Sequence, residues 1–359
     1  NAVGLANICI LSTMVLVTVS TTVSLYAGLE DSLDRMFPYD VDVIQSLEGV
    51  PPEEAEALTA DTLERVQTAA DEAGRKVELL QWSTLLDTVG WYAGNTFTLS
   101  TQDGVSTQIQ VLTADDYGRL TGHTVALEPD QVLVQAKNVD LPETFYMEDL
   151  PFHTAGAIAD FPRYNDAVFV SGQTAQLSLV VADGSVLSAV RDRNFGDDRR
   201  EFHVQMNLDG TDAEKQAFVD PLLAADVNGV YSVISRQDNA VDLYTMYGGF
   251  LFLGVFLGLL FLLSTVLIIY YKQISEGYED QRRYQIMQQV GMSPREVRAS
   301  IRSQVLLVFF LPLVTAGIHV AVAFPMLCKM LELFNLFDVR LFALCAAGTL
   351  LVFCAIYAL

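Results

Sequence analysis

The hydrophobic pattern of the chain is dominated by long apolar runs that contain no Asp, Glu, Lys or Arg. Four such runs occur, at Ala2–Tyr26, Leu243–Tyr271, Val305–Cys328 and Leu341–Leu359. A run of about 18 or more apolar residues is long enough to cross the roughly 30 Å hydrocarbon layer of a membrane as a helix. The pattern therefore predicts an α-helical membrane protein with four transmembrane helices.

Residues 28–242, between the first two runs, have the mixed pattern of a folded domain. A helix is predicted from Pro51 to Gly74, because acidic residues follow the prolines and a glycine ends the apolar period. Thr211 and Glu214 form a capping-box pattern that predicts a second helix. β-Branched or alternating residues predict strands at residues 76–82, 96–100, 106–112, 131–135, 167–170, 176–181, 201–207 and 229–234. We therefore predict a large mixed α/β domain between helices 1 and 2.

Positive charges in the short loops predict the orientation, since cytoplasmic loops carry the excess of Lys and Arg. Residues 272–304 carry six of these charges and residues 329–340 carry two, so we expect the first loop to be cytoplasmic and the α/β domain to be extracellular. The predicted order is transmembrane helix 1 at 1–27, the extracellular α/β domain at 28–242, helix 2 at 243–271, a cytoplasmic connection at 272–304, helix 3 at 305–328, a short extracellular turn at 329–340 and a truncated helix 4 at 341–359. Both ends lie in apolar runs without flanking charges, so we expect the chain to be part of a longer protein.

The charge of the chain narrows the possible partners. The formal net charge is −23, with 44 acidic against 21 basic residues, and most of the acidic residues lie within 28–242. Phosphate contacts need a basic surface, so this composition excludes nucleic acid as a partner and argues against adhesion of this domain to an anionic membrane face. Opposite charge raises encounter rates, so a cationic peptide is a candidate ligand.

The sequence contains no catalytic or metal-binding motif of the common hydrolase, zinc-protease, phosphate-loop or EF-hand types. We interpret Asp40 and Asp42 as part of a turn, and the histidines of the domain as ordinary hydrogen-bonded side chains: His123, His153 and His203. The four cysteines lie in or beside the apolar runs, so the domain has no disulfide. Three aromatic residues are candidates for ligand contact, although core packing is the alternative: Trp82, Trp91 and Tyr92.

The connection at 272–304 carries the most informative local pattern. Gly291 ends one predicted helix, and Ser293 caps the next, with Pro294 at its first position and Glu296 three residues after the cap. The pattern predicts a rigid elbow at the inner membrane surface. Its candidate residues for contact with a cytoplasmic partner are Gly291, Met292, Ser293, Pro294, Arg295, Glu296, Val297 and Arg298. The alternative is a connector whose arginines meet lipid head groups.

Small and polar residues in the apolar runs predict how the helices pack. Gly254 and Gly258 are spaced for close approach of a second helix. Pro312 and Gly317 weaken the backbone hydrogen bonding of the third run. His319 lies inside that run, where an ionisable group is either functional or bonded to a neighbouring helix.

The order of these elements and three short motifs resemble the FtsX-like permease subunits of ABC transporters, in particular the bacitracin-resistance type of Gram-positive bacteria. The motifs are Glu276-Gly-Tyr-Glu279, Ile286-Met-Gln-Gln-Val-Gly-Met-Ser293 and Leu313-Val-Thr-Ala-Gly-Ile-His319. Permeases of this type have ten membrane helices, so the resemblance covers about the C-terminal half of such a protein.

The resemblance implies a multi-pass protein of the bacterial plasma membrane, with no enzyme activity and no cofactor of its own. ATP would be bound by a partner, a cytoplasmic ABC ATPase that contacts the elbow. The implied function is resistance to, or sensing of, antimicrobial peptides. A cationic peptide or a cell-wall lipid precursor is then the candidate ligand, and a sensor histidine kinase and membrane lipids are further candidate partners. Two other functions remain open, namely mechanical activation of a cell-wall hydrolase and export of lipids or lipoproteins.

Overall fold

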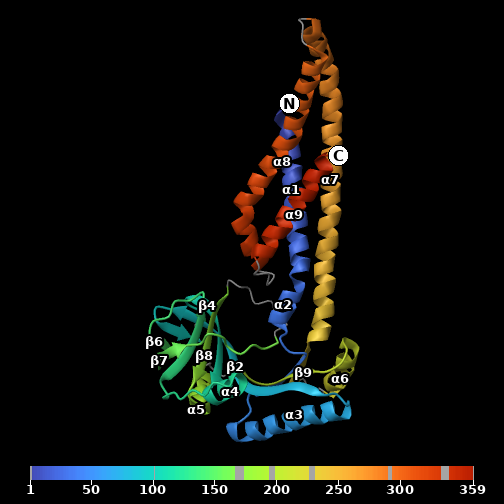
Figure 1. Cartoon of the computed structure of the whole chain (residues 1–359). Coiled ribbons are helices and arrows are strands. Elements are labelled where there is room, and N and C mark those ends of the chain that lie inside the picture. Colours follow the sequence, from blue (N-terminus) through green and yellow to red (C-terminus); the bar gives the residue numbers. More distant parts are fainter. Residues whose placement is uncertain are drawn as a thin grey trace. The chain divides into compact units, whose positions relative to one another are not determined.

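The computed structural model describes residues 2–100, 102–165, 174–193, 199–225, 231–289, 293–332 and 339–358. The chain divides into two compact units (Figure 1). One, called the helical unit below, consists of residues Asn1–Ser32 and Leu243–Leu359. The other, the α/β unit, consists of residues Leu33–Asp242.

The apolar runs form long helices. Their bounds are α1 at Ala2–Ala27, α7 at Arg236–Gln289, α8 at Pro294–Glu332 and α9 at Val339–Ala358, and a short helix α2 at Leu29–Met36 follows α1. Among the described residues, three helices are long and apolar enough to cross a membrane, over Ala6–Ala27, Arg236–Ser275 and Phe310–Glu332. The fourth predicted run is also helical, but its described apolar segment, Val339–Val352, is shorter. Three of the four predicted spans are thus confirmed as helices of sufficient length.

Helix α1 packs on α8 and α9 through aliphatic side chains. Val15 and Leu16 of α1 form one buried cluster with Leu313, Ala316 and Val320 of α8, and Cys354 of α9 lies beside it. Several hydroxyl groups of α1 are satisfied within the helix, since Thr22 and Ser24 donate hydrogen bonds to the carbonyl oxygens of Thr18 and Ser20. These bonds allow a helix rich in Ser and Thr to remain compatible with an apolar environment.

Helix α7 has tyrosines near both ends of its apolar part. Tyr244 and Tyr271 are exposed and lie about 40 Å apart along the helix, which is close to the thickness of a bilayer with its head groups. Tyrosine is enriched at both membrane interfaces, so this spacing fits a helix that spans the bilayer.

Helix α7 does not end with its apolar part. It continues past Ser275 for about 20 Å, as far as Gln289. The sequence predicted a helix that Gly291 ends, and α7 runs on as one helix through the polar residues that follow its apolar part. The elbow lies at the end of a helical extension.

The α/β unit contains ten strands and four helices among its described residues, in addition to the helix ends that it shares with α2 and α7. The strands are β1 Val41–Ser46, β2 Val77–Ala93, β3 Thr96–Thr98, β4 Val105–Thr113, β5 Gln131–Lys137, β6 Thr144–Met147, β7 Leu150–Ala157, β8 Ala175–Val181, β9 Arg200–Leu208 and β10 Tyr231–Ser235. The helices are α3 Pro52–Glu72, α4 Ala114–Thr121, α5 Gly184–Asp192 and α6 Asp212–Ala225. The predicted mixed α/β fold is confirmed.

The long strand β2 belongs to two structures at once. Its first half pairs with β9 and completes an antiparallel sheet in the order β10-β1-β9-β2. Its second half pairs with β3 and β4. The ladder β2-β3-β6-β7-β5-β8-β4 then returns to β2 and closes a seven-stranded barrel.

The antiparallel sheet and the barrel each have their own hydrophobic core. Helices α3 and α6 cover one face of the antiparallel sheet, where Val66 and Phe218 pack on Val43, Val204 and Met206. The barrel is filled by a separate cluster, in which three phenylalanines follow one another with ring centroids 5.9 Å apart: Phe97, Phe145 and Phe152. Since the domain has no cysteine, these two cores supply its stability.

Local signals predicted two helices of this unit, α3 and α6, correctly. Helix α3 ends at Glu72, just before the predicted stop at Gly74, which has φ +62°, a left-handed conformation that glycine adopts without strain. The capping box of α6 is confirmed, because the Glu214 carboxylate accepts hydrogen bonds from the backbone N–H of Thr211 at 2.8 Å and from its hydroxyl at 2.9 Å.

Strands that lack alternation were missed or cut short. The strand expected at 76–82 is the first half of β2, which runs on because residues such as Leu85 and Leu86 are buried on both faces. Strands β1, β6 and β7 and helices α2, α4 and α5 were not predicted. The strand expected at 167–170 lies outside the described residues.

Candidate functional site

The elbow between α7 and α8 has the predicted capping box. The Glu296 carboxylate accepts hydrogen bonds from the backbone N–H and the hydroxyl of Ser293, both at 2.9 Å. The backbone N–H of Glu296 in turn donates to the Ser293 hydroxyl at 3.4 Å and to its carbonyl oxygen at 3.0 Å. The bonds from Ser293 lower the pKa of Glu296, so the cap stays ionised at neutral pH. The start of α8 is therefore fixed at Pro294.

The elbow residues predicted from the sequence are only partly placed. Ser293, Arg295 and Glu296 are exposed at the start of α8, where Pro294 is the first helical residue; Val297 and Arg298 belong to the same helix, and Gly291 and Met292 lie outside the described residues. The arrangement presents a cation and an anion, Arg295 and Glu296, on adjacent positions of a rigid helix end. Such a surface suits contact with another protein.

Gly254 and Gly258 of α7 lie against α1. A Cβ atom on Gly254 would come 2.7 Å from the Cβ of Thr22, and one on Gly258 would come 2.5 Å from Cγ2 of Val19. Both distances are shorter than van der Waals contact, so only glycine permits this approach of the two helices.

A valine at position 254 is therefore expected to separate α7 from α1. Overpacking of this kind costs about 1–3 kcal/mol, so we expect Gly254→Val to lower the thermal midpoint of the detergent-solubilised chain. Gly249→Val is the matched control, because a Cβ at Gly249 meets no atom within 4 Å. Equal midpoints for the two variants would show that the close approach does not contribute to stability.

His319 of α8 has a partner on α1. Its Nδ1 lies 3.4 Å from the hydroxyl oxygen of Thr13, which also donates a hydrogen bond to the carbonyl oxygen of Cys9 at 2.8 Å. The geometry thus agrees with the alternative in which His319 is bonded to a neighbouring helix.

The three candidate aromatic residues do not form one site. Trp82 lies in the first half of β2, packs on the core beneath α3 and has the Arg119 guanidinium 5.4 Å from its ring. Trp91 and Tyr92 lie in the second half of β2, about 30 Å further along the strand. Tyr92 packs on Phe97, with ring centroids 4.5 Å apart. All three side chains are half-buried, and Tyr92 in particular belongs to the barrel core.

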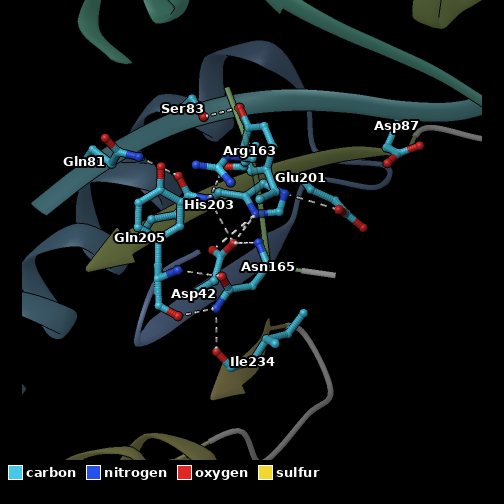
Figure 2. A network of polar contacts seen from close by, with 12 residues as sticks. Asp42, Gln81, Ser83, Asp87, Arg163, Asn165, Glu201, His203, Gln205 and Ile234 are labelled. Atoms are coloured by element: carbon cyan, nitrogen blue, oxygen red, sulfur yellow. Dashed lines mark hydrogen bonds and ion pairs between the residues drawn. The ribbon is translucent and has the colours of Figure 1, made fainter. Parts of the chain in front are cut away.

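The α/β unit contains a buried polar cluster that the sequence analysis did not predict (Figure 2). It lies on the face of the antiparallel sheet opposite to α3 and α6, and its central residues are Asp42 of β1, His203 and Gln205 of β9, and Asn165. Each of these is at most 3% exposed. Asp42 was interpreted as a turn residue, and this interpretation is wrong, because Asp42 lies within β1 and its side chain is fully buried.

His203 is held between two carboxylates. Its Nδ1 lies 3.1 Å from Oδ2 of Asp42, and its Nε2 lies 3.4 Å from Oε2 of Glu201. The ring of Tyr164 packs edge-on at 4.6 Å, and the Tyr164 hydroxyl hydrogen-bonds to that of Ser83 at 2.8 Å. Burial lowers the pKa of His203, but the charge and hydrogen bond of Asp42, together with Glu201, raise it more, to about 9. His203 is therefore a buried cation at neutral pH.

The remaining polar groups of the cluster form hydrogen bonds with Asp42 and with one another. Gln205 Nε2 donates to Oδ2 of Asp42 at 3.2 Å and also to the carbonyl oxygen of Arg163. Gln81 Nε2 donates to Oε1 of Gln205 at 3.0 Å. Within the described residues no group of three or more metal-ligand side chains could hold a metal ion. Buried hydrogen bonds of the cluster thus link β1, β2 and β9.

Comparison with known proteins finds a family match for the C-terminal part of the chain. Residues 255–359 match the family model described as FtsX-like permease C-terminal. Residues 255–359 form an FtsX-like permease domain. This domain contains most of α7 together with α8 and α9, and so includes the elbow and Gly258. The match and the three apolar helices indicate a membrane protein.

Two curated proteins of Bacillus subtilis (strain 168) are similar to part of the chain. ABC transporter permease protein YxdM is 32% identical over 69 residues, which is 19% of this chain and 11% of that protein. Bacitracin export permease protein BceB is 30% identical over 97 residues, which is 27% of this chain and 15% of that protein. The alignments therefore span a small part of these relatives.

Proposed function

We propose that the chain is part of the permease subunit of an ABC transporter, which couples ATP hydrolysis by a partner ATPase to the α/β unit. The observation that carries this proposal is the capped elbow within the FtsX-like domain. Its helix start is fixed by Ser293 and Glu296, and Arg295 is exposed beside them. A movement imposed on a rigid, capped helix end is passed along the whole helix, whereas a frayed end would absorb it.

The helix contacts support a path for that movement. Helix α8 packs on α1 through Leu313, Ala316 and Val320, and α7 contacts α1 at Gly254 and Gly258. The three helices are therefore mechanically connected. Helices α1 and α7 lead into the α/β unit through α2 and β10 respectively. We propose a multi-pass topology with the α/β unit outside the cell.

The substrate class is proposed from the relatives. The name of BceB describes bacitracin export, and the acidic composition of residues 28–242 suits a cationic ligand. Resistance to, or sensing of, antimicrobial peptides is the function that combines these observations. ATP would be bound by the partner subunit.

The proposal is tested by reconstituting the full-length permease with its ATPase and measuring ATP hydrolysis with and without cationic antibiotic peptides. We expect peptides to stimulate hydrolysis and Arg295→Ala to reduce this stimulation about fivefold, since arginine is enriched among the few interface residues whose truncation costs more than 1 kcal/mol. Arg65→Ala is the control, because Arg65 is exposed on α3 and pairs with Asp61 of the same helix. A complex that assembles and hydrolyses ATP but ignores all peptides would contradict the proposed function.

A further inference from the structure

The chain enters and leaves the α/β unit through two neighbouring segments. The entry segment, residues 37–40, joins α2 to β1, and the exit segment, residues 234–237, joins β10 to α7. Strands β1 and β10 are antiparallel neighbours, with Val41 opposite Ser235, and the backbone N–H of Arg236 donates to the carbonyl oxygen of Asp40 at 2.9 Å. The two segments therefore lie side by side at one edge of the sheet.

Side chains fasten the two segments together. Arg236 donates from Nη1 to the carbonyl oxygen of Phe37 and from Nη2 to the carboxylate of Asp34, each at 2.6 Å. Asp40 accepts hydrogen bonds from Gln237 Nε2 at 3.2 Å and from Lys215 Nζ at 2.7 Å. These polar bonds reinforce the pairing of β1 with β10, which holds the entry and exit segments together.

A third segment, the strap of residues 158–165, reaches both of them through Asn165. The backbone N–H of Tyr39 donates to Oδ1 of Asn165 at 3.0 Å, and Nδ2 of Asn165 donates to the carbonyl oxygen of Tyr39 at 2.9 Å and to that of Ile234 at 3.4 Å. Figure 2 shows Asn165 between the cluster around Asp42 and the carbonyl group of Ile234. One buried amide therefore bonds to the entry and exit segments at the same time.

The other end of the strap is attached to the barrel. The backbone N–H of Ile158 donates to the carbonyl oxygen of Val134 in β5 at 2.9 Å. Ile158 and Phe161 are buried in one cluster with Leu112 of β4 and Val180 of β8. The strap thus connects the sheet edge where the chain enters and leaves with the wall of the barrel.

We propose that Asn165 is a relay residue, which makes the position of the strap depend on the spacing between the entry and exit segments. The amide satisfies its bonds to Tyr39 and Ile234 only while the two segments stay together. Separation of the segments breaks the bond from Asn165 to one of them and leaves buried polar atoms unpaired, which costs free energy and favours movement of the strap. A change at the sheet edge is thereby passed to the barrel, and a ligand on the barrel acts on the sheet edge by the same linkage.

A double-mutant cycle followed by hydrogen–deuterium exchange of the full chain in lipid nanodiscs tests the relay. Arg236→Ala loosens the sheet edge, and we expect it to raise the exchange rate of the strap amides about tenfold while α3 keeps its protection. In the Asn165→Ala background, where the relay is already broken, the same change is expected to raise strap exchange less than about twofold. Neither ATP nor a partner is needed, so the result is independent of the proposed transport function.

Two matched variants serve as controls. Arg191→Ala removes an arginine that bonds to Asp192 on α5, and Asn95→Ala removes an exposed asparagine from the turn between β2 and β3. Both are expected to leave strap exchange unchanged. Loss of protection in α3 would mean that Arg236→Ala unfolds the sheet more widely. In that case the milder variant Arg236→Lys is measured, and the increase in strap exchange is again compared with and without Asn165. Unchanged strap exchange in the Arg236 variant, or an equal increase with and without Asn165, would overturn the proposal.

Discussion

Replacement of His203 by glutamine is expected to destabilise the α/β unit by about 3–5 kcal/mol, the largest effect of any single change considered for this chain. Asp42 is completely buried, and His203 is its cationic partner at 3.1 Å. Removal of the imidazole leaves a buried carboxylate with hydrogen bonds from Gln205 and Asn165 but no opposite charge. A carboxylate in this position is costly because it has lost its hydration without gaining an ion pair.

The effect is measured by urea unfolding of the full chain in detergent, followed by tryptophan fluorescence. Both tryptophans of the chain, Trp82 and Trp91, lie in β2, so their emission reports the α/β unit. The control is the double variant His203→Gln/Asp42→Asn, which replaces the ion pair by two neutral amides of similar size. We expect it to recover much of the lost stability. A double variant as unstable as the single one would mean that packing, and not the unpaired charge, causes the loss.

The second large effect is a dependence of stability on pH. The pKa of His203 is raised from an ordinary value of 6.5 to about 9, so the folded state binds its proton more tightly than the unfolded state does. This contribution is fully present below pH 6.5 and is lost as the pH rises through about 9. Its size is on the order of 3 kcal/mol. We therefore expect the urea midpoint of the α/β unit to fall between pH 6.5 and pH 9.5.

Two comparisons isolate the contribution of His203. The other two histidines of the α/β unit, His123 and His153, are exposed. The His203→Gln/Asp42→Asn variant is therefore expected to lose most of the pH dependence, whereas His153→Gln is expected to keep it. A flat urea midpoint in the unchanged chain would show that His203 is neutral in the folded state.

The sequence by itself determined those features that depend on neighbouring residues. The capping boxes at Thr211 and Ser293 and the glycine stop at Gly74 were predicted because each is completed within three or four residues along the chain. The long apolar helices were predicted for the same reason, since length and composition are local properties. The motifs of the FtsX-like domain are also contiguous, and the family match over 255–359 agrees with them.

Which polar residues of the α/β unit are buried, and which partners they have, could be learned only from the tertiary structure. Asp42 and His203 are separated by 161 positions, and Asn165 lies 126 positions from Tyr39. No periodicity links such residues, and Asp40-Val-Asp42 taken alone is as suitable for a turn as for a buried strand. The division of β2 between a sheet and a barrel depends likewise on strands from both ends of the domain. Burial converts these separate residues into one network, because a polar group removed from water must find its partner wherever the fold supplies it.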